Sequence, residues 1–207
     1  MENYGEKIRT FIAVSFSGDA AMFFQELQAR LKGAKIRASF PEPSTIHLTL
    51  KFLGDIQASM VPEICQCISG TVLKFKKEVT SDNKDNPCEI ITLWSGGLGV
   101  FPSIARPKII WAGVHGQTNR LEKLHDLLDL ALNRIGFKRE KRGFTPHFTL
   151  ARIKKKINPE KIMDIVRDSA GLKSGKLMCS SIVFYRSKLT PAGAVHTELF
   201  SWPLVPT

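Results

Sequence analysis

Short apolar stretches with a period of two residues recur along the chain and predict β-strands. Each is rich in β-branched or aromatic residues and is bounded by glycine, proline or polar turn residues, which is typical of strands. The alternation is clear in "RTFIAVSF" (9–16) and weakest in "TVLKFKKEV" (71–79). The predicted strands are 9–16, 46–53, 71–79, 89–96, 108–114, 147–153, 176–187 and 194–204.

A period of three to four residues marks the helices. Residues 20–31 place alanine, phenylalanine and leucine on one face, and Gly33 ends the pattern. The leucine stripe over 118–135 is the clearest, and a glycine follows it. Residues 158–170 begin with an asparagine in the N-cap position and a proline in the first turn. A fourth helix is predicted over about 59–69.

The order of these elements favours an α+β fold. Helices and strands are mixed, and the connections are short and rich in turn residues, so we expect helices packed on antiparallel sheets. The polar stretch 80–88 predicts an exposed loop, which is either a boundary between two lobes or a hairpin tip. The stretch 96–107 contains several glycines and prolines and predicts an irregular loop.

One motif occurs twice. The sequence "TIHLTL", which begins at Thr45, is matched by "TPHFTL" one hundred residues later. In a strand, residues i and i+2 point to the same face. His47 and Thr49 therefore share one face of the first strand, and His147 and Thr149 share one face of the second.

The repetition predicts two related halves that meet across a groove. Strict alternation places the apolar side chains of the first motif strand, Phe52 included, on the face opposite its histidine. A single histidine beside a threonine is more often a satisfied structural pair. Two copies in matching contexts favour a groove that holds two imidazoles and two hydroxyls.

Such a groove suits substitution at phosphorus. Two histidines can give and accept a proton on opposite sides of one atom at neutral pH. Threonine hydroxyls can bind the non-bridging oxygens. Metal binding is the competing interpretation, but a catalytic zinc site normally has three protein ligands. Neither motif supplies an Asp, Glu or Cys beside its histidine, so we expect no metal and no other cofactor.

Charge and composition narrow the range of partners that the protein could bind. Thirty Lys and Arg residues against nineteen Asp and Glu residues give a net charge of +11, which favours a polyanion such as RNA, although the charge could serve solubility alone. The basic runs 138–142 and 152–156 form either one wall of a basic groove or a solvated face. No apolar stretch is long enough to span a membrane, and no secretion signal is recognised. The four cysteines form no CxxC pair and are expected to be reduced in a cytoplasmic protein.

Several segments resemble one protein family along nearly the whole chain. "STIHLTLKFLGD" and "FTPHFTLAR" resemble the paired His-x-Thr-x motifs of the 2H phosphoesterases, in particular the RNA 2′,3′-cyclic phosphodiesterases, also called LigT-like 2′-5′ RNA ligases. "GLGVFPSIARPKIIWAGV", "LHDLLDLALNRIGF" and "FYRSKLTPAGAVH" are similar to their central segment, their helix before the second motif and their closing hairpin.

The resemblance implies a fold, a reaction and roles for four residues. It implies a single bilobal α+β domain over 1–207, in which two antiparallel sheets are related by pseudo-twofold symmetry, helices pack outside and a groove lies between. It implies hydrolysis of an RNA terminal 2′,3′-cyclic phosphate to a 2′-phosphate, with His47 as the proton donor, His147 as the proton acceptor, and Thr49 and Thr149 binding phosphate. Cyclic nucleotides would also serve as substrates, and we expect a monomer. The alternatives are 2′-5′ ligation of tRNA halves and an RNA- or nucleotide-binding module without turnover.

Other candidate residues are less constrained. Arg152 would suit a phosphate oxygen, but alternation places it opposite its motif histidine unless a bulge intervenes. Arg106 lies in the central loop and could reach RNA, and Phe144 could stack on a base or pack in the core. His196 stands where the family often has an aromatic residue. His125 lies beside the leucine stripe, which favours a structural role.

Overall fold

The computed structural model of the protein describes residues 5–18, 20–82, 91–191 and 193–204. Within these residues, the helices are α1 (Ala20–Gly33), α2 (Val61–Asp82), α3 (Thr118–Arg134) and α4 (Pro159–Asp168). Short 3-10 turns occupy Pro43–Thr45 and Ala58–Met60. The strands are β1 (Lys7–Ser17), β2 (Ala38–Ser39), β3 (Leu48–Gln57), β4 (Thr92–Phe101), β5 (Ile109–Gly116), β6 (His147–Ile153), β7 (Leu177–Thr190) and β8 (Gly193–Pro203).

The described strands form one continuous antiparallel sheet with two distinct halves. One half has the order β3–β1–β7–β8, and the other has the order β2–β6–β5–β4. Two short pairings join them: Leu48 of β3 opposite Phe148 of β6, and Thr92–Leu93 of β4 opposite Leu177–Met178 of β7. The predicted α+β fold with antiparallel sheets is confirmed.

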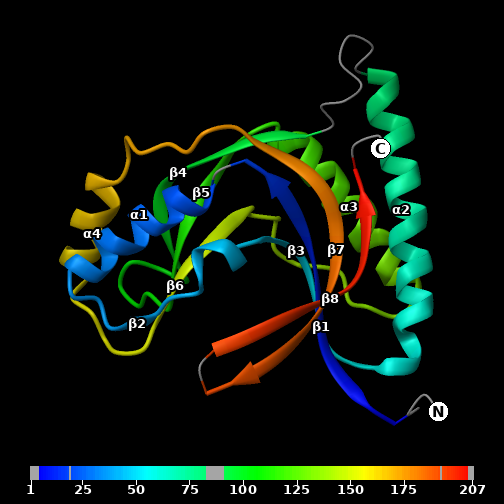
Figure 1. Ribbon diagram of the computed structural model, residues 1–207, viewed down its shortest axis with the longest axis horizontal. Coiled ribbons are helices and arrows are strands. Elements are labelled where there is room, and N and C mark those ends of the chain that lie inside the picture. The colour runs from blue at the N-terminus through cyan, green and yellow to red at the C-terminus, as the bar shows by residue number, and fades with distance from the viewer. Residues whose placement is uncertain (1–4, 19, 83–90, 192, 205–207) are drawn as a thin grey trace.

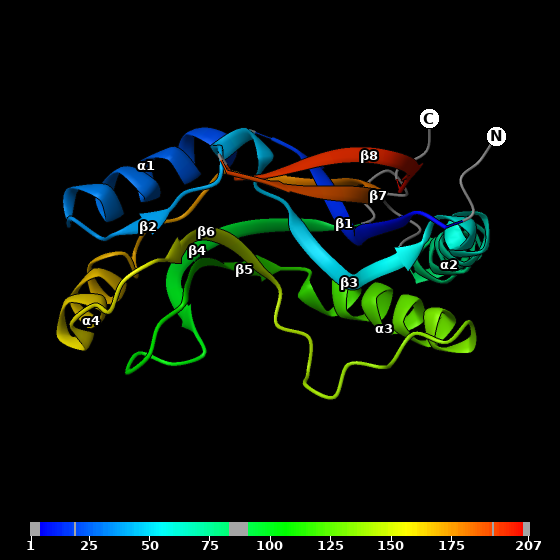
Figure 2. The ribbon, with the colours of Figure 1, turned by 90° about the horizontal axis from the view of Figure 1, so that it is seen from below.

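The helices cover the outer faces of the two halves. Helix α1 contacts β6 and α4 contacts β4, whereas α2 and α3 pack on each other and contact β8 and β3. Figures 1 and 2 accordingly show α1 and α4 at one end of the molecule and α2 and α3 at the other. The inner faces of the two halves are left free of helices, and this is where a groove can form.

Helix α2 corrects one prediction. The strand predicted over 71–79 is wrong, because α2 continues through it to Asp82. The buried apolar residues of α2 follow helical spacing rather than alternation, and they form one face that packs in the core. They are Ile64, Ile68, Val72, Phe75 and Val79. The tertiary contacts of this face therefore outweigh the local strand propensity of the valine and phenylalanine residues.

Strand β4 extends further than the sequence predicts. It continues through the glycines of 96–99 to Phe101, so the irregular loop of this region is confined to 102–108. A Cβ atom on Gly99 would lie 2.2 Å from the ring of Trp111 on β5, so only glycine lets this ring lie across β4. Of the loop predicted over 80–88, residues 80–82 belong to α2. The rest of that loop and the first residues of the strand predicted over 89–96 lie outside the described residues.

Candidate active site

A groove of about 670 Å³ opens between the two halves of the sheet. Strands β1, β3 and β6, the segment before β3 and the β7–β8 hairpin contribute its walls. Both motif histidines and both motif threonines line it, together with further polar side chains that include Arg152 and His196. The groove thus brings together the residues that the sequence places one hundred positions apart.

The two motif histidines are held by the same hydrogen bond. The Nδ1 atom of His47 lies 3.0 Å from the carbonyl oxygen of Thr45, and that of His147 lies 2.8 Å from the carbonyl oxygen of Thr145. A carbonyl oxygen can only accept, so Nδ1 carries the hydrogen in both rings. Each neutral imidazole then has its lone pair on Nε2, which is the nitrogen available for proton transfer.

His47 lies among other rings. Its imidazole stacks on Phe11 with a centroid distance of 4.8 Å, and it meets the edge of His196 at 5.3 Å. The pKa of His47 is lowered to about 4. Burial is the largest cause, the hydrogen bond to Thr45 acts in the opposite direction, and the charges of His196, Arg152 and His147 add smaller downward effects. In the free protein, the neutral form of this ring is therefore strongly favoured at neutral pH.

His147 has a similar environment in the second half. The ring of Phe101 meets it edge-on at a centroid distance of 5.0 Å, and the ring of Trp111 lies 6.1 Å away. Burial lowers the pKa of His147, and the charge of Arg152 lowers it as well. The neutral form of both histidines is therefore favoured at pH 7 in the free protein.

The motif threonines lie beside their histidines. Thr49 and Thr149 are half-buried, line the groove and stand on the same strand faces as His47 and His147. This is the arrangement that the period of two residues predicts. Two hydroxyl donors from opposite halves can approach the non-bridging oxygens of one phosphate.

A register shift follows each motif and reverses the alternation. In the pairing of β3 with β1, the shift falls between Thr49 and Lys51, so Leu50 has no partner on β1. In the pairing of β6 with β5, it falls between Thr149 and Ala151, so Leu150 has no partner on β5. Such a bulge turns the following side chains to the other face. Arg152 consequently faces the groove. From the sequence, this orientation was expected only if a bulge interrupted the alternation.

The same shift corrects the prediction for Phe52. Strict alternation placed this side chain on the core-facing side of β3, but it lines the groove and is 61% exposed. Lys51 takes the core-facing position instead and is 4% exposed. Its ammonium group donates to Asp129 of α3 at 2.5 Å and to the carbonyl oxygen of Lys138 at 2.8 Å.

His196 is a third imidazole in the groove, and the sequence did not assign it a role. It lies on β8 opposite Ser187, contacts the edge of Phe11 at 4.9 Å and has an Nδ1 atom without a hydrogen-bond partner in the described part of the chain. Burial lowers its pKa, and the charge of Arg152 does so too. Arg152 therefore acts electrostatically on all three histidines of the groove.

Two of the predicted substrate-binding residues lie outside the groove. Arg106 is exposed in the loop 102–108 and does not line the groove. Phe144 packs against the core and stacks on His125 at a centroid distance of 4.2 Å, so it does not line the groove either. His125 is buried on α3, in agreement with the structural role expected for it.

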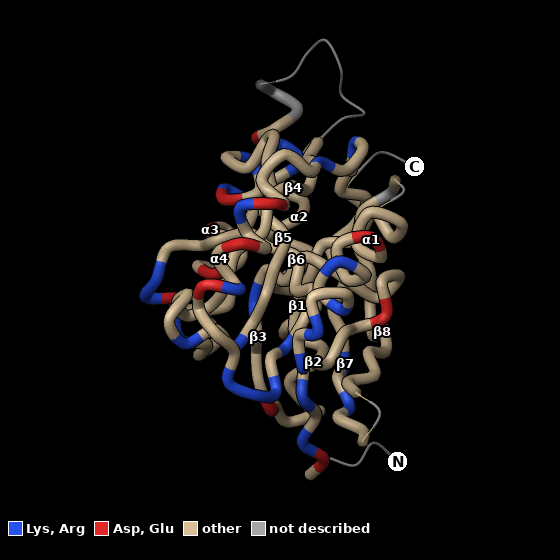
Figure 3. The backbone as a smooth tube through the Cα atoms, turned by 90° about the vertical axis from the view of Figure 1, so that its left-hand side faces the viewer, with Lys and Arg blue, Asp and Glu red and all other residues tan. Residues whose placement is uncertain are grey.

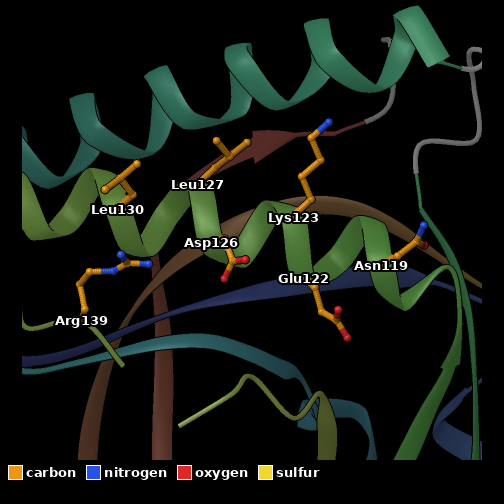
Figure 4. A pocket seen from close by; sticks show the side chains of 7 residues that line it. All are labelled: Asn119, Glu122, Lys123, Asp126, Leu127, Leu130 and Arg139. Carbon is orange, nitrogen blue, oxygen red and sulfur yellow. The ribbon is translucent and has the colours of Figure 1, made fainter. Parts of the chain in front are cut away.

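A second cavity, of about 430 Å³, lies on α3 and has none of the predicted site residues. Figure 4 shows its lining side chains, which are Asn119, Glu122, Lys123, Asp126, Leu127 and Leu130 of α3 and Arg139 of the segment that follows it. Arg139 belongs to the basic run 138–142 and donates to Asp129 at 3.1 Å. This part of the run is therefore anchored to α3 rather than to the groove.

The charge around the groove is mainly positive. Figure 3 shows Lys and Arg along β7, whose residues Ser187 and Leu189 line the groove. The charged residues of the lining are Arg9, Arg152 and Glu42. In the described residues, no three His, Cys, Asp or Glu side chains are grouped so that they could hold a metal ion. Likewise, no helix in the described part of the chain is long and apolar enough to cross a membrane.

Known proteins are similar to this chain in sequence, and a solved structure is similar to it in fold. The chain is 29% identical over 193 residues to the RNA 2′,3′-cyclic phosphodiesterase of Methanothermobacter thermautotrophicus, covering 93% of this chain and 97% of that one. It is also 29% identical over 176 residues to the protein of the same name from Aeropyrum pernix, covering 83% of this chain and 92% of the relative. Among solved structures, E. coli LigT complexed with 3′-AMP superposes with a TM-score of 0.64 at 20% identity and covers 96% of this chain and 99% of its own. The model of the 2′-5′ RNA ligase superfamily matches residues 16–190, and the protein belongs to this superfamily.

Proposed function

We propose that the protein hydrolyses the 2′,3′-cyclic phosphate at the end of an RNA to a 2′-phosphate, without a metal ion. The observation that carries this proposal is the pair of Nδ1-anchored imidazoles on matching strands of one groove, each with a threonine hydroxyl beside it. Relatives that align along most of the chain are named RNA 2′,3′-cyclic phosphodiesterase. Two-histidine acid–base chemistry and hydroxyl donors are what this reaction requires.

The proposed mechanism divides the proton transfers between the two halves. Nε2 of His147 removes a proton from water as the water oxygen attacks phosphorus opposite O3′. The bond between phosphorus and O3′ breaks, and protonated His47 gives its proton to O3′. The products are a free 3′-hydroxyl and a 2′-phosphate. Thr49, Thr149 and Arg152 bind the non-bridging oxygens, on which negative charge builds up in the transition state.

The lowered pKa of His147 suits its proposed role as a base, whereas His47 can act as an acid only if the bound substrate raises its pKa. An anion that enters the groove favours the protonated form of any imidazole beside it and raises its pKa. The cyclic phosphate carries such a charge, so the substrate itself promotes protonation of His47, whose pKa in the free protein is about 4. Binding and protonation of the acid are thereby coupled.

The proposed partner is an RNA end rather than a membrane or a protein. The net charge of +11 favours a polyanion, and a cyclic nucleotide fits a groove of about 670 Å³ as the minimal substrate. We propose a cytoplasmic monomer; the described cysteines, Cys65, Cys67 and Cys179, are all free, which is usual in a reducing compartment.

Product analysis tests the proposal. A short RNA with a 2′,3′-cyclic phosphate end is incubated with the protein in EDTA, and the product is identified by mass and by its resistance to a 3′-specific phosphatase. We expect a 2′-phosphate, and its formation should be on the order of 10²–10⁴-fold slower with the His147→Ala variant. A 3′-phosphate product, or activity that EDTA abolishes and zinc restores, would contradict the proposal. Addition of a second RNA with a 5′-hydroxyl tests ligation, which would appear as a longer product.

A further inference from the structure

Three polar side chains form a row across the first half of the sheet, on the part of the groove wall next to His47. They are Arg9 of β1, Ser187 of β7 and His196 of β8, and all three line the groove. Neighbouring strands contribute them, because β1 pairs with β7 and β7 pairs with β8 (Figure 1). The proposed proton transfers and phosphate contacts use none of the three.

The strand register brings these side chains onto one face. Ser187 lies directly opposite His196. Thr10 lies opposite Arg186, so Arg9 comes one position further along the antiparallel pair, beside Ser187. Two strand spacings, or about 10 Å, separate the backbone at Arg9 from that at His196. A single phosphate group between these two long side chains is therefore within reach of both.

The polar atoms of the row are available to a ligand. Within the described residues, the guanidinium of Arg9 forms no ion pair, although Asp55 lies opposite it on β3, and the hydroxyl of Ser187 forms no hydrogen bond. Nδ1 of His196 is buried and has no partner there either. A hydrogen on Nδ1 would find no acceptor, so the neutral ring is better satisfied with its hydrogen on Nε2. From Nε2 it can be donated to an anion in the groove.

The row begins next to the proposed acid. The ring of His196 meets that of His47 at a centroid distance of 5.3 Å, and both rings contact Phe11. In the proposed mechanism His47 protonates O3′, so the ribose of the reacting nucleotide lies on this side of the groove. The same ribose carries the 5′-oxygen, which in an RNA continues into the phosphate that joins the preceding nucleotide. That phosphate therefore lies on the side of the row.

The charge of the lining favours an anion at this place. Among the lining residues that the structure describes, Glu42 is the single acidic one, and it precedes the 3-10 turn Pro43–Thr45 rather than lying on β1, β7 or β8. Arg152 binds the reacting phosphate in the proposed mechanism, which leaves Arg9 as the arginine of the lining without a ligand. A guanidinium combined with neutral donors suits a phosphodiester.

We propose that Arg9, Ser187 and His196 bind the internucleotide phosphate on the 5′ side of the nucleotide that carries the cyclic phosphate. The inference rests on the proposed function, because it places the chain that leads to the reacting end. The guanidinium of Arg9 supplies the charge, and the hydroxyl of Ser187 and Nε2 of His196 donate hydrogen bonds. The groove then has a second phosphate subsite, by which the protein distinguishes an RNA end from a free cyclic nucleotide.

The test compares two substrates that differ in this phosphate. Adenosine 2′,3′-cyclic phosphate is compared with the same compound bearing a 5′-methyl phosphate, a diester with one negative charge. An arginine and two neutral donors should add on the order of 10-fold to affinity, so kcat/KM of the wild type should favour the diester by this ratio, through KM. Arg9→Gln should lower the ratio towards one, and so should His196→Phe, which keeps a ring but removes the donor. Arg9→Lys should retain part of the ratio, because it keeps the charge and loses the fork.

Arg186→Gln is the matched control. Arg186 is the neighbour of Ser187 on β7, pairs with Glu6 and does not line the groove, so its loss changes the net charge by the same amount. It should keep the full ratio. A ratio that is unchanged in Arg9→Gln, or that falls equally in Arg186→Gln, would overturn the inference. The same holds for an equal loss on both substrates in Arg9→Gln.

Binding without turnover separates this inference from the proposed reaction. Calorimetry compares adenosine 2′-phosphate with and without the 5′-methyl phosphate. A wild type that hydrolyses neither cyclic substrate, but binds the diester compound more tightly only when Arg9 is present, would refute the reaction and support the subsite. A wild type that hydrolyses both cyclic substrates with a ratio of one would support the reaction and refute the subsite.

Discussion

His47 and His147 are oriented by identical hydrogen bonds, Nδ1 to the carbonyl oxygen of the residue two positions earlier, at 3.0 Å and 2.8 Å. Their equivalence means that the difference between the proposed acid and the proposed base must come from the substrate and from the surrounding charges. His47 has two further imidazoles and an arginine acting on it, whereas His147 has the arginine.

A sulfur atom in place of O3′ separates the two roles. Loss of either imidazole should reduce the rate on the normal substrate by on the order of 10²–10⁴-fold. A thiolate leaves without protonation, so His47→Ala should recover much of its lost rate on the 3′-thio substrate. His147→Ala should not recover, since its water still lacks a base. Single-turnover kinetics on both substrates measures this, and recovery of His147→Ala alone would mean that the roles are exchanged.

The pH profile of kcat/KM, which reports the free protein, should differ from that of kcat, which reports the complex with substrate. The profile of kcat/KM reports the free groups, and with His47 at about 4 and the pKa of His147 also lowered, its optimum should lie below pH 6.5. The profile of kcat reports the complex, in which the bound anion raises both pKa values, so it should be displaced to higher pH. Initial rates with a cyclic mononucleotide over pH 4–9 test this. Coinciding profiles would show that substrate binding does not change the protonation of the histidines.

Arg152 should set the pKa values of the groove as well as bind phosphate. Removal of its charge in Arg152→Gln should raise the pKa of His47, His147 and His196, each of which it lowers. Nuclear magnetic resonance titration of the imidazole nitrogens, with selective assignment of each histidine, measures the three values. Arg106→Gln is the control, because Arg106 is also an exposed arginine but does not line the groove. A similar shift in both variants would point to net charge rather than to Arg152.

A higher salt concentration should weaken RNA binding but leave KM for a cyclic mononucleotide almost unchanged. Each phosphate neutralised by the protein adds about 0.7 to the slope of log K against log salt concentration for a single strand. The net charge of +11 can act on several phosphates of an RNA but on only one of a cyclic mononucleotide. Fluorescence anisotropy of a labelled RNA and KM for the mononucleotide, both from 50 to 400 mM salt, should therefore diverge. Equal sensitivity would place RNA contacts at the reacting phosphate alone.

The buried pair Lys51–Asp129 should stabilise the first motif strand against α3. Both side chains are nearly inaccessible, at 4% and 3% exposure, and Asp129 also accepts hydrogen bonds from Arg139 and from the backbone of Glu140. Burial alone raises the pKa of Asp129, but the hydrogen bonds from Lys51 and Arg139 outweigh it and lower the pKa. Lys51→Met leaves the carboxylate without its main partner and should cost about 3–5 kcal/mol in the free energy of unfolding.

Urea unfolding at pH 7 measures this loss, and the double variant Lys51→Met with Asp129→Leu should recover part of it, since no buried charge is then left unpaired. Because the folded pKa of Asp129 is lowered, the contribution of the carboxylate is complete above its unfolded pKa, about 3.9, and is lost as the pH falls through the folded value. A double variant that is less stable than either single variant would contradict this account of the pair.

The sequence determines the main elements of the fold through periodicity. Helix α3 and strand β6 lie where the leucine stripe and the second motif predict them, because each has one apolar face that a neighbouring element covers. Helix α2 was shortened in the prediction, since Val72 and Phe75 favour a strand locally and a helix only once their packing against the core is known. Propensity is a weak signal where tertiary contacts compete with it.

The residues of the candidate site also form two groups, those that the sequence places and those that only the tertiary structure places. The spacing His-x-Thr alone places each imidazole beside its hydroxyl, because neighbouring positions of one strand face are fixed by backbone geometry. The register shifts at Leu50 and Leu150, which bring Phe52 and Arg152 into the groove, depend on how β3 pairs with β1 and β6 with β5. His196 reaches His47 only through the return of the β7–β8 hairpin. Contacts between segments that are far apart in the chain arise from strand pairing, which local sequence does not encode, so only the tertiary structure decides them.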